Sequence, residues 1–306
     1  MHVEHQLEIN ILIAPNIETF FIVNNPNPFD VILWTLRRSE GDVVNLYNYL
    51  SGLMQISTGG NFLNFGYWDE TTKNPIDAQS NLCNMVGNIA HLTDARNILD
   101  VGSGFSEPAI LWKKKYPDMD ITCLNINSNQ LKSANYTLDK NGSKINLLNS
   151  TATKIPLSNE SCDRIIALES AQHFKPIQEF ISEAKRVLKK DGFIILAIPV
   201  LLKPTKMDFL KIGILKFTWS SEHYDLEKVK KTINDAGLNI IETQLIGSKV
   251  YSPLADYYIK NHEFLRTKIL KTYPFYVEKI LFKSMVKMKE AARDQTIEYA
   301  LVKCTK

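Results

Sequence analysis

The residues best suited to chemistry lie where an apolar run meets a glycine-rich turn. The run Asn97–Val101 reads as a buried strand with one acid, Asp100, and it is followed by Gly102 and Gly104 and then by a helical pattern. Glycine has no Cβ, so a ligand can approach the backbone of such a turn closely. The acid beside the turn argues against a phosphate ligand and suits a cationic amine. This combination indicates S-adenosylmethionine as the ligand and methyl transfer as the chemistry.

A nicotinamide dinucleotide is the main alternative ligand for this turn. Its fingerprint requires a third glycine in the pattern G-x-G-x-x-G and an acid after the second strand, which binds a ribose hydroxyl. The stretch Gly102–Pro108 has no third glycine, and the second strand ends in Asn125-Ile126 without an acid. The dinucleotide interpretation therefore fails on both requirements.

A second candidate for chemistry is His173, which follows the expected fourth strand at 163–168. The carboxyl ends of parallel strands share one edge of a sheet, so His173 is expected at the edge that carries the glycine turn. An imidazole accepts a proton near neutral pH, which suits it to deprotonate a hydroxyl nucleophile. An isolated histidine at a strand end is more often structural, so the role depends on the surrounding motif.

The elements that must position these residues alternate between strand and helix. Helices are expected at 42–58, 76–91, 108–116, 128–140, 176–189 and 226–236, and strands at 97–101, 120–125, 145–149, 163–168, 192–199, 239–246 and 297–304. This order predicts an α/β fold, doubly wound and Rossmann-like, with a mostly parallel sheet of seven strands.

Some parts of the chain do not follow this alternation. Residues 1–58 are interpreted as an N-terminal extension with one helix, and residues 59–306 as the domain that contains the sheet. Insertions at about 200–224 and 248–292 are rich in aromatic residues and lysine. Because loops of this length usually carry function or helices of their own, we expect helical caps over the carboxyl edge of the sheet.

The composition supports a folded domain and argues against several other classes of protein. Hydrophobic residues make up 44% of the 306 residues, and no apolar run reaches the ~18 residues of a membrane span. The formal net charge of +3 is too small to indicate a nucleic-acid partner by itself. The N-terminus lacks the pattern of a signal peptide, and the cysteines are scattered, so we expect reduced thiols in a cytoplasmic protein.

Several motifs occur in an order and spacing that resemble those of class I S-adenosylmethionine-dependent methyltransferases. They are Gly66-Tyr67-Trp68, Leu99–Gly104, Glu107-Pro108-Ala109, Leu168–Phe174, Ala236-Gly237-Leu238 and Tyr299–Val302. Within that class the chain is similar to the natural-product sugar O-methyltransferases of the rebeccamycin type. The similarity runs from about residue 59 to residue 304. Together the motifs are specific for the family, but they say little about the substrate.

The resemblance implies a site for S-adenosylmethionine, with S-adenosylhomocysteine as product and no metal. Asp100 and the two glycines would hold the methionine part, and Asn125 would meet the ribose. Ile126 would pack on the adenine, and Thr151 falls where the family often has an acid that meets the same ring. The implied cofactor residues are Tyr67, Asp100, Gly102, Gly104, Asn125, Ile126, Gln130, Thr151, Ala152 and Glu169.

The resemblance also implies that His173 is the base, but the residues around it depart from the family. Gln172 replaces a second histidine, and Ile198 stands where an acid would orient the imidazole. A histidine without its carboxylate is a poorer and less well oriented base. Three residues could substitute for that acid, namely Glu169, His223 and Asp225. Two further departures affect the cofactor site: Ser106 replaces a third glycine, and Thr151 lacks the acid's charge.

These observations predict O-methylation of a small, partly apolar molecule of the natural-product or glycoside type. One alternative is C- or N-methylation of a lipid or isoprenoid, because lysines alternate with apolar residues in 203–217 and 268–289 and could contact a membrane surface. Another is a non-catalytic binding or regulatory protein that retains the fold, which the departures at Ser106, Thr151 and Ile198 motivate. A nucleic-acid acceptor is disfavoured because the chain has no separate basic RNA-binding module. The sequence leaves the acceptor and the oligomeric state open.

Overall fold

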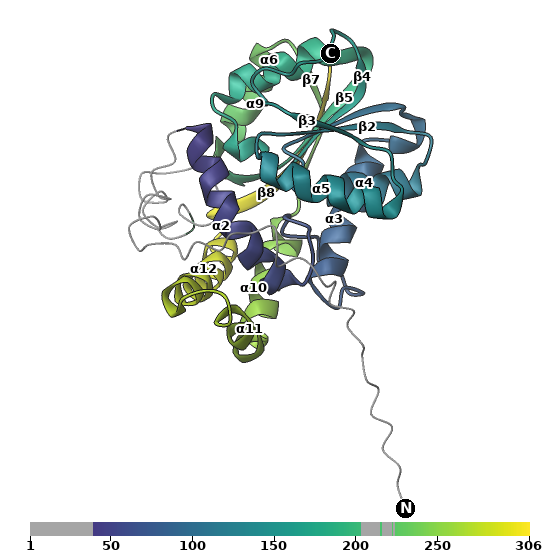
Figure 1. Cartoon of the computed structure of the whole chain (residues 1–306). Helices are drawn as coiled ribbons and strands as arrows, with labels where there is room; N and C mark the ends of the chain where they lie inside the picture. The colour runs from purple at the N-terminus through teal and green to yellow at the C-terminus, as the bar shows by residue number, and fades with distance from the viewer. Residues whose placement is uncertain (1–38, 203–214, 216–221, 223) are drawn as a thin grey trace, which may run out of the picture.

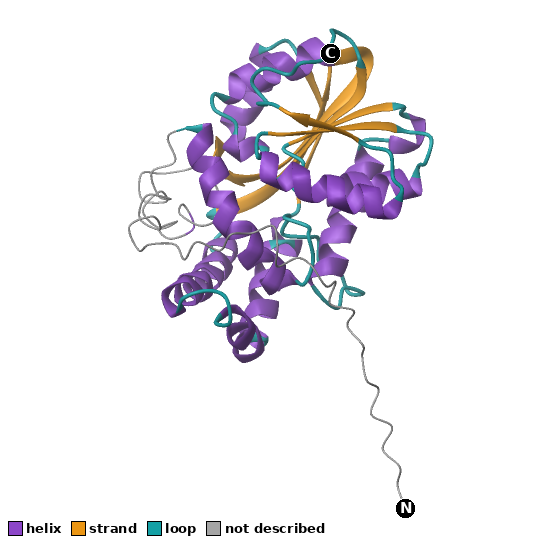
Figure 2. Cartoon of the chain, viewed as in Figure 1, coloured by secondary structure: helices purple, strands orange, loops and turns teal. Residues whose placement is uncertain are grey.

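The centre of the molecule is a mostly parallel sheet flanked by helices (Figure 2). The computed structural model describes residues 39–202, 215, 222 and 224–306. The strand order is β3-β2-β1-β4-β5-β8-β7, and a short β6 pairs with β5. Strand β8 runs antiparallel to both of its neighbours, β5 and β7, and the other pairs of described strands are parallel. The predicted seven-stranded, doubly wound sheet is confirmed, with β6 as an addition. The strands are β1 (Asn97–Val101), β2 (Asp120–Asn125), β3 (Asn146–Asn149), β4 (Cys162–Leu168), β5 (Leu188–Leu201), β6 (Tyr224–Asp225), β7 (Asn239–Leu245) and β8 (Ile297–Thr305).

The sheet separates two hydrophobic cores, because successive strand residues point to opposite faces. On β1, Ile98 joins the core that contains Trp112 of α4, and Leu99 joins the core that contains Phe180 of α6. Figure 1 shows the helices in their places around the sheet. The helices are α2 (Glu40–Thr58), α3 (Pro75–Ile89), α4 (Glu107–Lys115), α5 (Ser128–Asn141), α6 (Ile177–Val187), α9 (Leu226–Asp235), α10 (Tyr251–Lys260), α11 (His262–Ile269) and α12 (Phe275–Arg293).

Among the strands, β5 differs most from its expected range of 192–199, because it extends to Leu201. Its last residues stay in the sheet because they continue to pair with β8, up to Leu201 opposite Ile297. The strand also begins at Leu188, so α6 ends at Val187 and is shorter than the helix expected at 176–189.

Helices α10, α11 and α12 form the cap expected for the insertion at 248–292. Helix α12 packs along α10 and is followed by β8, while α11 contacts α2. Because β8 starts opposite the carboxyl end of β5, the cap lies at the carboxyl edge of the parallel strands. Figure 1 shows α10, α11 and α12 together with α2 at this end of the molecule. Most of the other expected cap, at 200–224, lies outside the described residues.

Three further features bear on the expectations from the sequence. In the described ranges, no helix has the length and apolar character needed to cross a membrane. All four cysteines are buried free thiols. The same residues contain no group of three or more His, Cys, Asp or Glu side chains that could hold a metal ion.

Candidate cofactor and acceptor site

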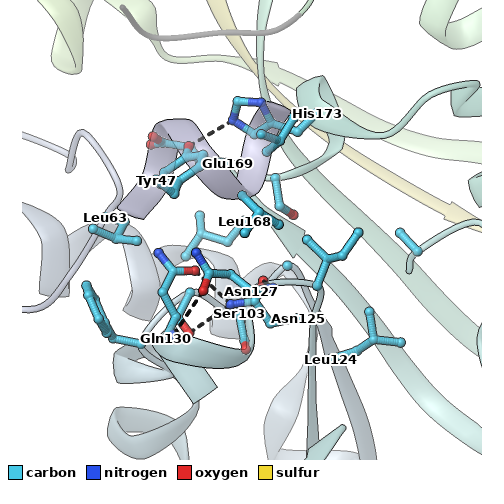
Figure 3. A pocket seen from close by; sticks show the side chains of 18 of the residues that line it. Tyr47, Leu63, Ser103, Leu124, Asn125, Asn127, Gln130, Leu168, Glu169 and His173 are labelled. Carbon is cyan, nitrogen blue, oxygen red and sulfur yellow. Dashed lines mark hydrogen bonds between the residues drawn. The ribbon is translucent and has the colours of Figure 1, made fainter. Parts of the chain in front are cut away.

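A cavity lies at the carboxyl ends of β1, β2 and β4, with an empty volume of about 880 Å³ that includes its opening to solvent. Its place beside β1 and β4 is where the strand order reverses, which is where open α/β sheets bind ligands. Figure 3 shows part of its lining. Most of the expected site residues line it: Gly102, Gly104, Asn125, Ile126, Gln130, Ala152, Glu169 and His173.

The glycine turn after β1 leaves bare backbone at the cavity wall. Gly102 has a φ of +75° and Gly104 has a φ of +56°, values that residues with a side chain rarely adopt. A Cβ at Gly102 would lie 2.4 Å from the Cβ of Ser170. Ser106, which replaces the expected third glycine, has a φ of +61°, and its hydroxyl lies 3.2 Å from that of Ser103. The serine therefore keeps the backbone conformation of the turn.

Asp100 does not line the cavity but lies directly behind the turn, fully buried at the end of β1. Its Oδ2 has no hydrogen-bond partner among the described residues. Burial raises the pKa of this carboxyl to about 7, because a low-dielectric environment disfavours the charged form. An unpaired buried carboxyl next to bare backbone fits the cationic amino group of S-adenosylmethionine. The residues present thus fit the implied cofactor.

The polar wall of the cavity comes from β2 and α5. The Asn125 side-chain amide donates to the Gly104 carbonyl at 3.1 Å and to Gln130 Oε1 at 2.8 Å. Asn125 Oδ1 accepts a long bond of 3.4 Å from the backbone of Asn127, so it retains capacity for a ligand hydroxyl. Gln130 in turn donates to Ser51 Oγ of α2 at 3.0 Å. This network connects the expected ribose residue to α2.

The acid missing at Thr151 is supplied by another element. Thr151 does not line the cavity; its hydroxyl donates to a carboxylate oxygen of Glu40, in the first turn of α2, 111 positions away. Glu40 lines the cavity together with Ser150 and Ala152. A carboxylate therefore lies at this wall, although β3 and the residues after it provide none.

Tyr67, expected to close over the cofactor, also lies away from the cavity. Its backbone N–H donates to the Ala78 carbonyl at 2.8 Å, and its side chain packs against the core. Other residues of the same loop line the cavity instead, namely Asn61, Leu63 and Asn64. The loop thus contributes to the site through its first half.

The expected base, His173, meets a tyrosine from α2. His173 ends the short turn Ala171–His173 after β4 and is mostly buried. The Tyr47 hydroxyl lies 2.8 Å from His173 Nε2, and the two rings meet edge to face at 5.3 Å (Figure 3). The side-chain nitrogen of Gln172 lies 3.5 Å from the same atom. Sequence reasoning did not identify Tyr47, because the pattern of an amphipathic helix does not show which residues the helix contacts.

Two of the three residues considered as substitutes for the missing carboxylate, Glu169 and Asp225, have other partners. Glu169 accepts hydrogen bonds from the Phe65 N–H at 2.8 Å and from the Tyr299 hydroxyl at 2.9 Å. Burial raises the pKa of Glu169 to about 8. Asp225 Oδ1 accepts the Glu227 N–H at 2.8 Å at the start of α9. His223 lies outside the described residues.

Comparison with known proteins places these features in context. The family model described as a methyltransferase domain matches residues 99–196, from β1 to β5. Among curated proteins, the chain is similar to erythromycin 3''-O-methyltransferase of Saccharopolyspora erythraea, with 24% identity over 74% of this chain and 78% of that protein.

Solved structures share the fold at low sequence identity. The [4+2]-cyclase SpnF has a TM-score of 0.72 and 20% identity, covering 87% of this chain and 96% of that one. The mycolic acid cyclopropane synthase CmaA1, complexed with S-adenosylhomocysteine and CTAB, has a TM-score of 0.72 and 18% identity, covering 83% of this chain and 94% of that one.

Proposed function

Because this chain is an S-adenosylmethionine-dependent methyltransferase with the class I fold, we propose that it methylates a hydroxyl of a small, partly apolar acceptor of the natural-product or glycoside type. The observation that carries this proposal is the pair formed by His173 and Tyr47 in the wall of the cofactor cavity. The similarity to an erythromycin O-methyltransferase supports the same acceptor class.

The cofactor, when bound, supplies a methyl group already activated on a sulfonium. The protein then has to position the reactants, exclude water and take up one proton. We assign the methionine part to Asp100, Gly102 and Gly104. We assign the ribose to Asn125 and the adenine to the wall formed by Ile126 and its neighbours. The assignments use an apolar side chain, polar groups and a stretch of bare backbone found at or directly behind the cavity wall.

His173 would remove the proton of the acceptor hydroxyl, which makes that oxygen the nucleophile. A neutral imidazole accepts at one nitrogen only, and a hydroxyl at 2.8 Å from Nε2 suits acceptance there. The Tyr47 hydroxyl thus marks a position from which a hydroxyl can donate to Nε2. In the free protein the same contact holds the ring orientation, and the acceptor hydroxyl has to replace the Tyr47 hydroxyl at Nε2 before its proton is taken up, because that nitrogen has one lone pair.

The assignment of Asp100 predicts a pH dependence of cofactor binding. Since the pKa of Asp100 is raised to about 7, lowering the pH from 8 to 6 neutralises the group that would attract the ligand's ammonium. We expect the Kd for S-adenosylhomocysteine, measured by calorimetry, to rise about tenfold over this interval. Asp100→Asn should bind more weakly at pH 8 and show a flat profile. A profile unchanged in Asp100→Asn would assign the titration to another group, such as Glu169.

The acceptor type is tested by product analysis. Purified protein would be incubated with labelled S-adenosylmethionine and a panel of glycosides, macrolide aglycones and isoprenoids. Mass spectrometry and NMR would then identify the labelled products. An O-methyl product supports the proposal. Methylation only on carbon or nitrogen would contradict it and favour the second candidate below.

The second candidate is C- or N-methylation of a lipid or isoprenoid, and an exposed apolar surface favours it. Phe264 and Phe275 are 59% and 68% exposed around the turn between α11 and α12, with Leu270 between them in sequence. Lys268 lies over the Phe264 ring at 4.3 Å. Aromatic residues beside lysines suit the interface of an anionic membrane.

Co-sedimentation with vesicles tests this surface. If it contacts membranes, the double variant Phe264→Ser/Phe275→Ser should bind phosphatidylserine vesicles about tenfold more weakly, because two apolar side chains are lost from the interface. The control is Ile241→Ser, which removes a side chain of β7 with 53% exposure. Equal binding by all three proteins, or no binding by wild type, would remove the support for a membrane-derived acceptor.

A further inference from the structure

A second cavity lies inside the cap, between α2, α10 and α12. Its empty volume is about 480 Å³, which includes its opening to solvent; eight of its thirteen lining residues are apolar and none is charged. The polar groups that α2 contributes are already used: Ser57 donates to the Leu53 carbonyl at 2.7 Å, and Thr58 donates to the Met54 carbonyl at 2.9 Å. The apolar lining includes Leu50, Leu53, Met54, Leu254, Leu281 and Met285.

Two residues that line the cap cavity, Tyr258 and Asn64, each have a buried polar atom without a partner among the described residues. Tyr258, on α10, is 2% exposed, and its hydroxyl has no hydrogen-bond partner among the described residues. Other buried tyrosines nearby are satisfied: the Tyr251 hydroxyl donates to the Glu298 carbonyl and the Tyr273 hydroxyl donates to the Tyr49 carbonyl, each at 3.1 Å. Because buried hydroxyls are nearly always bonded, the exception at Tyr258 indicates a partner that the described part of the chain does not supply.

The cap cavity shares a wall with the cofactor cavity. Asn64 lines both, and its Oδ1 also lacks a partner within the described residues. The next residue, Phe65, also lines the cap cavity, and its N–H donates to Glu169 of the cofactor cavity. A molecule in the cap cavity would therefore lie against the segment that holds Glu169.

We propose that the cap cavity is a binding site for an uncharged, largely apolar small molecule with one hydrogen-bonding oxygen, which the Tyr258 hydroxyl contacts. The apolar walls exclude a charged ligand, because they offer no compensating partner for a charge. The Tyr258 hydroxyl, which has no partner among the described residues, would form a hydrogen bond with the ligand's oxygen. The apolar portion of a methyl acceptor and a separate apolar effector share this chemistry. The site itself does not depend on the proposed O-methylation.

The test uses the full-length protein and an uncharged fluorescent probe, N-phenyl-1-naphthylamine. Saturating S-adenosylhomocysteine is present throughout, so that the cofactor cavity is filled. We expect the probe to bind, and decan-1-ol to displace it. Leu254→Trp, which fills the cavity, should weaken probe binding at least tenfold. The matched control Leu245→Trp, at a 48% exposed position on β7, should bind as wild type does.

Tyr258→Phe keeps the ring and removes one oxygen, so it tests the site even if Leu254→Trp does not fold. In this variant, the concentration of decan-1-ol that displaces half of the probe should be about fivefold higher, as expected for the loss of one hydrogen bond. Probe binding that is insensitive to Leu254→Trp in a folded protein, or decan-1-ol competition unchanged in Tyr258→Phe, would overturn the proposal. Probe that binds only without S-adenosylhomocysteine would also overturn it, because the probe would then occupy the cofactor cavity.

Steady-state kinetics distinguish the two sources of ligand. With an acceptor from the product screen, competitive inhibition by decan-1-ol would assign the cap cavity to the acceptor's apolar part. Non-competitive effects would assign it to a separate ligand, and either result supports the site. Failure to detect O-methylation would contradict the proposed function while the probe results remain valid, so the two ideas fail separately.

Discussion

Gly102→Asp is expected to lose cofactor binding, with a Kd for S-adenosylhomocysteine at least about 100-fold above that of wild type, or ~2.8 kcal/mol. Gly102 sits at a φ of +75° in the cavity wall, and any Cβ there would meet Ser170 at 2.4 Å. The new carboxylate would also project where backbone is now bare, near the buried Asp100. Strain, collision and charge therefore act in the same direction. Calorimetric titration measures the result directly.

The same substitution at Gly142 is the matched control. Gly142 also has a positive φ, +65°, but a Cβ there would meet nothing within 4 Å. Gly142→Asp should cost about 1 kcal/mol of stability from backbone strain and leave the Kd unchanged. Thermal unfolding would confirm that both variants fold. A folded Gly102→Asp protein that binds within about threefold of wild type would contradict the assignment of the turn as the cofactor site.

The sequence predicted those parts of the fold and site that depend on local information. The turn at Gly102 is an example, because strand, glycines and helix follow one another within a few residues. Ser106 is a mild departure from the family's third glycine, yet the serine adopts a φ of +61° and retains the conformation. Local pattern could not show this, since the surrounding contacts decide whether a non-glycine residue accepts that conformation.

The parts that the sequence could not predict come from contacts between distant segments. Helix α2 was placed in an N-terminal extension, and its pattern indicated only an amphipathic helix. In the structure it supplies Glu40 at the wall near Thr151 and Tyr47 beside His173. Tyr47 and His173 are 126 positions apart. The departures at Ser106, Thr151 and Ile198 favour a non-catalytic interpretation, but α2 offers a polar group for each of the two missing acids.

His173→Ala is expected to lower kcat by about 10²- to 10⁴-fold, the range typical for loss of a general base. The Kd for S-adenosylhomocysteine should stay within about twofold, because His173 is assigned to the acceptor hydroxyl rather than to the cofactor. Tyr47→Phe keeps the edge-to-face ring contact but removes the hydroxyl at 2.8 Å. We expect an intermediate loss of about tenfold in kcat, since the imidazole remains but one bond that orients it is gone.

His91→Asn is the control for loss of a histidine outside the cavity. His91 precedes β1, at the opposite edge of the sheet, and its φ of +49° is one that asparagine tolerates. This variant should retain both kcat and cofactor affinity. The pH profile adds a readout that a purely structural role would not move: kcat of wild type should fall as His173 becomes protonated, and His173→Ala should lose that limb. Turnover of His173→Ala equal to that of wild type would exclude the base role. A reaction that needs no base, on an amine or an acidic hydroxyl, would then account for the methyl transfer.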